Sequence, residues 1–120
     1  RLINLVQKLK LSNKVIFTGF KENIFTLIKK TDLCIISSRI EGFPNILNEM
    51  IYLNDRVLSS YCTDSISYID FILKSDIYNI ESFSKAIDNG VVFNLNSTEK
   101  KSKVNYLSRL GINDYFETWI

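Results

Sequence analysis

A continuous apolar run, Leu33-Cys34-Ile35-Ile36, constrains the fold of this chain more than any other feature. Such a run is typical of a strand buried on both faces, as in a parallel sheet that helices cover above and below. Further along, Pro44 stands where a helix through about Leu53 would begin, and Val57-Leu58-Ser59 has the composition of another strand. This order of strand, helix and strand predicts a right-handed crossover between parallel strands.

The segment before this run shows the same alternation. Apolar residues recur at helical spacing near the start of the chain: Leu2, Leu5, Val6 and Leu9. The β-prone run Val15-Ile16-Phe17-Thr18 follows, and Asn23 can cap a short second helix. We therefore expect an α/β fold with a Rossmann-like parallel sheet flanked by helices. Ligands bind such sheets at the carboxyl ends of the strands, so the loops after Thr18, Ser37 and Ser60 should share one edge.

The second half of the chain has weaker patterns. Three groups of apolar residues have helical spacing: Ile66, Ile69 and Leu73; Phe83, Ala86 and Ile87; and Val104, Leu107 and Leu110 within a polar segment at residues 96–110. Residues 115–120 form an aromatic end. No linker or repeat divides the chain, so we treat residues 1–120 as one domain.

The composition excludes several kinds of chemistry. The chain has no histidine and only two cysteines, which rules out Ser-His-Asp and Cys-His catalysis and leaves no ordinary zinc site. We expect neither a metal nor a cofactor. The net charge of +2 comes from scattered Lys and Arg residues, so no nucleic-acid partner is expected, while a weak attraction to a membrane surface stays open. No apolar run reaches the length of a membrane span and no signal pattern is present, which favours a cytoplasmic location.

The strongest functional signal lies between Ser37 and Glu49, where a strand end leads through a glycine turn into a helix. Gly42 lets the backbone approach a ligand closely, and the free N–H groups of the first helical turn suit a phosphate or a sugar hydroxyl. Glu41 would lie beside that pocket, where a carboxylate can accept two hydrogen bonds from a vicinal diol. Spacing alone leaves an alternative open, in which both glutamates are ordinary solvated charges.

The helix that follows the turn has two distinct faces. Its apolar positions form one stripe, made of Ile46, Leu47, Met50 and Ile51. Its polar positions form another at spacings of three and four, made of Asn45, Asn48, Glu49 and Tyr52. We therefore expect Glu49 to point away from the core, so that Glu41 and Glu49 together can hold both ends of a nucleotide sugar.

The sequence resembles the large family of retaining glycosyltransferases of the GT-B fold, often called family 4. Their C-terminal domains carry a Ser…Glu-Gly-Phe-Pro-Asn-x-x-x-Glu motif, and the stretch from Glu41 to Glu49 matches its spacing. Residues 15–19 are similar to the family's strand and glycine turn, and residues 32–38 to its next strand. The resemblance implies that residues 1–120 are part of a C-terminal nucleotide-sugar-binding domain, a truncated half of the GT-B fold. The start at Arg1 instead of Met fits a fragment.

The resemblance also implies a role for each matched residue. Glu41 is assigned the catalytic role, as the residue that positions the donor sugar rather than as a nucleophile. The residues implied to bind the donor are Gly42, Phe43, Pro44 and Asn45 near the sugar and phosphates, Glu49 at the ribose, and Gly19, Phe20 and Lys21 beside the base.

Two segments depart from the family's pattern. Its Gly-x-Pro-Val segment is replaced by residues 51–57, in which Asn54 can supply the left-handed turn. Its Gly-rich loop after the third strand reads Cys62-Thr63-Asp64-Ser65-Ile66-Ser67-Tyr68 here, which leaves phosphate contacts from that loop open.

The implied function is that of a hexosyltransferase-type enzyme. The intact protein would transfer a sugar from a nucleoside diphosphate sugar, with retention, to a glycan or lipid-linked acceptor held by an N-terminal domain outside this chain. The setting expected from the family is bacterial surface polysaccharide or lipopolysaccharide biosynthesis in the cytoplasm or at the inner face of the membrane, and the fragment alone should be inactive. Two alternatives stay open: a sugar epimerase of the same architecture, and a non-catalytic remnant that contacts another protein through the aromatic end.

Overall fold

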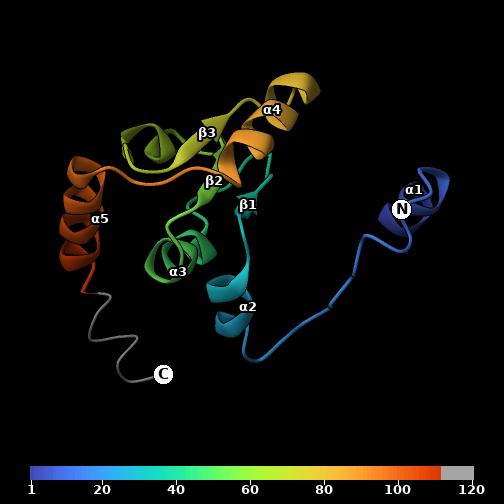
Figure 1. Cartoon of the computed structure of the whole chain (residues 1–120), viewed down its shortest axis with the longest axis horizontal. Coiled ribbons are helices and arrows are strands. Elements are labelled where there is room, and N and C mark those ends of the chain that lie inside the picture. Colours follow the sequence, from blue (N-terminus) through green and yellow to red (C-terminus); the bar gives the residue numbers. More distant parts are fainter. Residues whose placement is uncertain (112–120) are drawn as a thin grey trace.

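The computed structural model describes residues 1–111 of the chain as a small parallel sheet flanked by helices (Figure 1). In chain order its elements are α1 (Leu2–Lys8), α2 (Phe25–Lys30), β1 (Cys34–Ile36), α3 (Asn45–Leu53), β2 (Val57–Ser60), the 3-10 helix η1 (Asp64–Tyr68), β3 (Leu73–Ser75), α4 (Ile80–Gly90) and α5 (Ser97–Arg109). The predicted α/β, Rossmann-like arrangement is confirmed. The predicted aromatic end at residues 115–120 lies outside the described residues.

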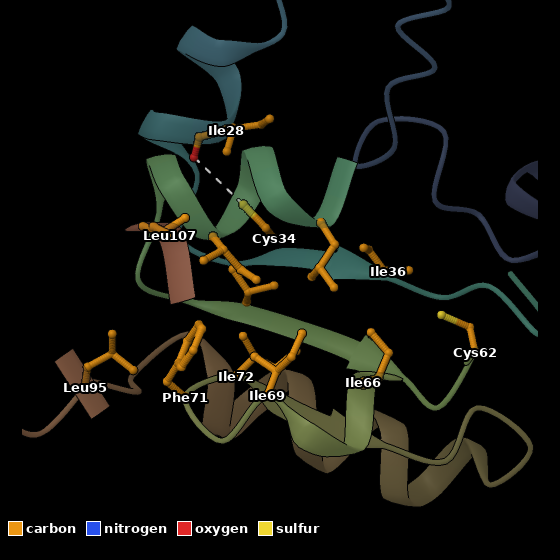
Figure 2. Packing of buried hydrophobic residues seen from close by; sticks show 13 residues of the cluster. Ile28, Cys34, Ile36, Cys62, Ile66, Ile69, Phe71, Ile72, Leu95 and Leu107 are labelled. Carbon is orange, nitrogen blue, oxygen red and sulfur yellow. Dashed lines mark hydrogen bonds between the residues drawn. The ribbon is translucent and has the colours of Figure 1, made fainter. Parts of the chain in front are cut away.

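The three strands lie in the order β1-β2-β3 and are all parallel. Cys34 pairs with Val57 and Leu58 with Leu73, so the strands advance together and their carboxyl ends meet at one edge. The helices divide between the two faces of the sheet. Helices α2 and α3 pack against each other on one face, whereas α4 contacts β2 and β3 from the other (Figure 2).

The core forms where these layers meet. The largest fully buried apolar side chains come from α3, β2 and η1: Leu47, Ile51, Val57, Leu58 and Ile66. Removing each of these side chains from water stabilises the fold by about 1.5–3 kcal/mol. On the α2 face, the Cys34 thiol points at the carbonyl of Ile28, at an S···O distance of 3.9 Å (Figure 2). The burial of Leu47 and Ile51 confirms these two positions of the apolar stripe predicted on α3.

The strand predicted at residues 15–18 is not present. These residues belong to an exposed connection between α1 and α2 that runs away from the sheet (Figure 1). A strand needs a hydrogen-bonded neighbour to be stable, and in the described chain β1 pairs only with β2. Helix α1 forms as predicted, but none of its residues is buried. The loop after Thr18 consequently does not share the edge reached by the loops after β1 and β2.

The helix predicted from the spacing of Ile66, Ile69 and Leu73 is also wrong. Instead of one helix, the chain forms η1 and then the strand β3, because Leu73 begins a strand that pairs with β2. Likewise, Ile35 on β1 is 37% exposed although both of its neighbours in the strand are buried, so this strand is not covered on both faces. Strand β1 is also an edge strand: within residues 1–111 it pairs with β2 and with no further strand.

The polar helix predicted at residues 96–110 is confirmed as α5, and it starts with a capping box. The Asn96 side chain accepts a hydrogen bond from the Glu99 N–H, while the Glu99 carboxylate accepts one from the Asn96 N–H. Only one residue of the predicted apolar face, Leu107, is buried, whereas Val104 and Leu110 are exposed. Helix α5 contacts α3, and it leaves Val104 and Leu110 in solvent.

Candidate functional site

The loop after β1 and the loop after β2 are joined by two hydrogen bonds. The Ser60 hydroxyl donates to the Ser38 carbonyl at 2.5 Å, and the Glu41 backbone N–H donates to the Cys62 carbonyl at 2.9 Å. Both contacts lie at the carboxyl ends of parallel strands, which is the edge where open α/β sheets bind ligands. The predicted convergence of the loops after Ser37 and Ser60 is therefore confirmed.

Glu41 lies on this edge with its side chain exposed and one oxygen engaged. The Ser38 hydroxyl donates a 2.7 Å hydrogen bond to Oε1 of Glu41. Because the backbone N–H of Glu41 is tied to the loop after β2 and its carboxylate is tied to Ser38, the position of the carboxylate is fixed by two neighbours before any ligand arrives. Its other oxygen is left to accept hydrogen bonds from outside the chain.

The turn after Glu41 opens onto the start of α3. A Cβ atom built on Gly42 would meet nothing within 4 Å, so the backbone there is open to an incoming group. Pro44 is buried and precedes the first helical residue, Asn45, which is exposed. Within residues 1–111 the N–H groups of Asn45 and Ile46 have no acceptor, as expected for the first turn of a helix. These two donors suit an anionic or hydroxyl oxygen.

Phe43, the remaining residue of the turn, is at the border of exposure at 36%. Its ring stands next to the open backbone of Gly42 in the sequence, so it can provide an apolar surface to a ligand at the turn. The segment from Glu41 to Asn45 therefore presents a carboxylate, an open backbone, an aromatic surface and free N–H groups in succession.

Glu49 lies in the second turn of α3 and is partly buried. Burial raises the pKa of its carboxyl group above the ordinary value, because the charged form loses hydration. In the described part of the chain no hydrogen bond or ion pair compensates this loss. A carboxylate without a protein partner in a partly dehydrated position is available to the hydroxyl groups of a ligand.

Asn48 is committed to the scaffold, in contrast to its neighbour Glu49. The Tyr106 hydroxyl of α5 donates a 2.9 Å hydrogen bond to Oδ1 of Asn48. The polar stripe predicted on α3 is therefore divided: Asn48 holds α5 in place, while Glu49 remains open.

Gly19, Phe20 and Lys21 are not brought to this edge. All three are exposed in the connection between α1 and α2, and Phe20 is 91% exposed (Figure 1). Gly19 does adopt the left-handed conformation, with φ at +61°, which agrees with the predicted glycine turn. The turn exists, but it is separated from Glu41.

The structure adds groups at this edge that the sequence did not single out. The Arg39 guanidinium lies over the Tyr78 ring, 6.0 Å from the centroid, which joins the loop after β1 to the loop after β3. Arg39 also lines an open cavity of about 700 Å³ together with residues of α1. The contact with Tyr78 could not be foreseen because β3 itself was missed.

Residues 51–57 and 62–68, the two segments that depart from the family's pattern, each adopt a defined structure. Asn54 is extended, with φ at −142°, so the left-handed turn expected there is wrong. Its side-chain amide instead donates to the carbonyls of Ile28 and Thr31, at 2.8 and 2.9 Å. Within residues 62–68, Asp64–Tyr68 form η1, in which Ile66 is buried and the other four residues are exposed.

Over residues 1–111, no cluster of three or more Cys, Asp or Glu residues could hold a metal ion. No helix within the same range is long and apolar enough to cross a membrane.

Comparison with known proteins identifies the family of this chain. The family model described as "Glycosyl transferases group 1" matches residues 1–69, which include the whole segment from Ser38 to Glu49 and its partner loop at Cys62. The chain belongs to this family.

This chain is similar to a protein of Methanocaldococcus jannaschii that is named an uncharacterized glycosyltransferase. The two are 37% identical over 62 residues, which cover 52% of this chain and 15% of the relative. The match thus spans a small part of the length of that protein. No solved structure matches the chain at a significant level.

Proposed function

We propose that this chain is the donor-binding part of a retaining glycosyltransferase that uses a nucleoside diphosphate sugar. The observation that carries the proposal is the pairing of two open carboxylates with the free start of a helix. Glu41 is fixed beside the turn by Ser38 and by the loop after β2, and Glu49 lies in the second turn of α3, partly buried and without a partner among the described residues. This order of groups along the chain suits a ligand with hydroxyl groups at both ends and negative charge between them.

Each group then has a task. Glu41 positions the donor sugar through its hydroxyl groups, with Gly42 and Phe43 as the floor of the pocket. The N–H groups at Asn45 and Ile46 stabilise the charge that develops on the departing diphosphate. Glu49 accepts hydrogen bonds from the ribose diol.

In this proposal the acceptor hydroxyl attacks the anomeric carbon on the face from which the nucleoside diphosphate departs, so the configuration is retained. Glu41 is not a nucleophile, and no residue of this chain forms a bond to the sugar. The gain in rate comes from positioning and from electrostatic stabilisation of the leaving group. The acceptor, a glycan or a lipid-linked sugar of surface polysaccharide biosynthesis, would be held by a part of the protein outside this chain. The reaction would take place in the cytoplasm.

Ligand-observed NMR with uridine and guanosine diphosphates and their sugar conjugates tests this proposal. We expect weak saturable binding that is lost in Glu49→Ala and in Glu41→Ala. Glu81→Ala is the matched control, because Glu81 is an exposed helical glutamate whose contact is an ion pair with Lys85 on α4. Circular dichroism confirms that each variant is folded.

Equal binding by the wild type and both site variants would refute the assignment of these two carboxylates. If neither this chain nor the longer protein that contains it binds any of the nucleotides, the non-catalytic alternative replaces the transferase.

A further inference from the structure

We infer that Arg39 and Tyr78 form a subsite for an oxyanion, a carboxylate or phosphate group, that is carried by a sugar substrate. The Arg39 guanidinium binds the oxyanion, and the Tyr78 ring holds the guanidinium in place. That the ligand is a sugar rests on the proposed function, whereas the anion subsite rests on the geometry of the carboxyl edge and on the charges around it.

The backbone around Arg39 is held on both sides by the loop after β2. The carbonyl of Ser38 accepts from the Ser60 hydroxyl at 2.5 Å, and the Glu41 N–H donates to the Cys62 carbonyl at 2.9 Å. Because these two contacts flank Arg39, its side chain starts from a fixed point at the carboxyl edge of the sheet.

The Tyr78 ring holds the other end of the Arg39 side chain. It belongs to the loop after β3, and the guanidinium lies over it, 6.0 Å from the ring centroid. Since the strands lie in the order β1-β2-β3, this contact crosses the carboxyl end of the middle strand. The Tyr78 N–H donates to the Asp76 carboxylate at 2.8 Å, which fixes the loop that carries the ring. The guanidinium is thus held by an aromatic face, which takes none of its N–H groups.

Arg39 keeps its charge and its hydrogen-bond donors for a ligand. Its side chain is exposed, and within residues 1–111 it forms neither an ion pair nor a hydrogen bond. The neighbouring carboxylate of Glu41 is engaged by the Ser38 hydroxyl instead. The planar fork of N–H groups in arginine matches the two oxygens of a carboxylate or phosphate group.

The cavity beside Arg39 has the charge that an anion requires. Its volume is about 700 Å³, and its other charged residues are Arg1 and Lys8, at the two ends of α1. No acidic residue is among the described residues that line it. Three positive charges around one open space raise the local concentration of anions. The volume is also in the range of sites for small ligands.

The subsite is separate from the groups assigned to the departing diphosphate. Those groups are the N–H donors at the start of α3, which packs with α2 on one face of the sheet. Tyr78 instead leads into α4, which contacts the sheet from the other face (Figure 2). The oxyanion at Arg39 is therefore a second anionic group, on the transferred sugar or on the acceptor.

Protein-observed NMR of the full chain tests the subsite with glucuronate and glucose 1-phosphate, against glucose as the neutral probe. The readout is the Arg39 Nε–H signal, which is assigned by its loss in Arg39→Gln. We expect both acidic sugars to bind at least fivefold more tightly than glucose and to shift this signal. A comparison of UDP-glucuronate with UDP-glucose then identifies the source: a preference for the acidic conjugate assigns the oxyanion to the donor sugar, and a preference among the free sugars alone assigns it to the acceptor.

Arg39→Gln should remove the preference for acidic sugars, whereas Arg39→Lys should keep part of it, because a point charge replaces the planar fork. Arg109→Gln is the matched control, since Arg109 is exposed in the last turn of α5 and its loss changes the net charge equally. Equal binding of acidic and neutral sugars by the wild type, or equal losses in Arg39→Gln and Arg109→Gln, would overturn the inference.

Tyr78 acts through Arg39, so its variants test positioning. Tyr78→Ala should weaken the preference at least threefold, and Tyr78→Phe, which keeps the ring, should restore it. Circular dichroism confirms that each variant is folded. If Tyr78→Ala keeps the full preference, Tyr78 has no part in the subsite.

Glu49→Ala separates this inference from the proposed function. A variant that loses uridine diphosphate but keeps the preference for acidic sugars supports both sites. If the wild type shows the preference and binds no nucleotide, the oxyanion subsite stands and the donor assignment fails. Nucleotide binding without the preference has the opposite meaning.

Discussion

The Tyr106 hydroxyl on α5 donates a 2.9 Å hydrogen bond to Oδ1 of Asn48 on α3, next to the open carboxylate of Glu49. The Tyr106 ring also meets the Phe71 ring edge-on, with centroids 5.5 Å apart. Helix α5 is thereby fixed to the helix that carries the candidate site. The contact fixes the Asn48 side chain, and it ties the stability of α3 to that of a helix almost sixty residues further along the chain.

Removing this hydroxyl should weaken the fold without disturbing the aromatic contact. We expect Tyr106→Phe to lower the free energy of unfolding by about 1 kcal/mol, because Asn48 loses its donor while the ring stays in place. Urea denaturation measures the change. Tyr68→Phe is the control, since Tyr68 is 87% exposed, and it should change stability by less than about 0.5 kcal/mol.

The charged carboxylate of Glu49 should lower the free energy of unfolding at neutral pH, because it is partly buried and has no protein partner among the described residues. Burial raises the pKa of Glu49 in the folded state above its unfolded value, so the folded state holds the proton more tightly. Stability contributed by this group is therefore fully present below the unfolded pKa and is lost as the pH rises through the folded pKa. We expect Glu49→Gln to be slightly stabilising at pH 7, within about 0.5 kcal/mol because the site is partly exposed, and neutral at pH 4.

The measurement is thermal unfolding of Glu49→Gln and wild type at both pH values. Glu81→Gln, on an exposed helix surface, should show no such difference between pH 7 and pH 4 beyond the loss of its pair with Lys85. A destabilised Glu49→Gln at pH 7 would mean that the carboxylate has a stabilising partner after all.

Substitution by alanine should change the stability of the fold at Gly90 but not at Gly42. A Cβ atom on Gly90 would lie 2.8 and 2.9 Å from the two Cδ atoms of Leu33, whereas a Cβ atom on Gly42 would meet nothing. Overpacking costs about 1–3 kcal/mol, and alanine returns about 1 kcal/mol of helix propensity to α4. We therefore expect Gly90→Ala to destabilise the chain by about 1 kcal/mol in chemical denaturation.

Gly42→Ala should leave stability within about 0.5 kcal/mol of the wild type, since its backbone is not left-handed and the space is open. It should nevertheless weaken nucleotide binding in the NMR titration, because the added methyl group occupies the approach to the turn. Unchanged binding in this variant would argue against a ligand at Gly42.

Lys103 and Lys85 provide a comparison of two ion pairs. Lys103 is 13% exposed and donates to the Asn54 carbonyl at 3.1 Å as well as to Asp55, whereas Lys85 and its partner Glu81 are 71% and 79% exposed. Hydrogen bonds to charged groups contribute about 1.5–3 kcal/mol, and exposed ion pairs about 0–1 kcal/mol. We expect Lys103→Met to cost about 2 kcal/mol of unfolding free energy and Lys85→Met less than about 0.5 kcal/mol. Similar losses in the two variants would refute the distinction.

The sequence predicted those parts of the fold whose patterns are local. The strand at Cys34 to Ile36, the helix after Pro44 and the polar helix that starts near residue 96 each contain their own signal, and each forms close to where the sequence predicts it. Within residues 41–49 the loop and helix α3 are continuous, but the position of Glu41 also depends on the distant Cys62 carbonyl, which accepts from its backbone N–H.

The misassigned elements depend on distant partners. Leu73 has helical spacing to Ile66 and Ile69, but pairing with Leu58 decides that it begins a strand. Residues 15–18 have the composition of a strand, but the strand prediction was wrong, because in the described chain this segment has no neighbouring strand with which to pair. Similarly, the contact between Arg39 and Tyr78 depends on a strand that the sequence did not indicate.

The match to the glycosyltransferase family ends at residue 69, yet several contacts that support its segment come from beyond that point. The Arg56 guanidinium donates to the Phe93 carbonyl, Lys103 holds Asp55, and the Tyr106 hydroxyl donates to Asn48. The boundary of recognisable similarity is therefore not a boundary of folding. A protein shortened to the recognised half would lose the anchors of α3 and β2 together, so the two halves should melt in a single cooperative transition.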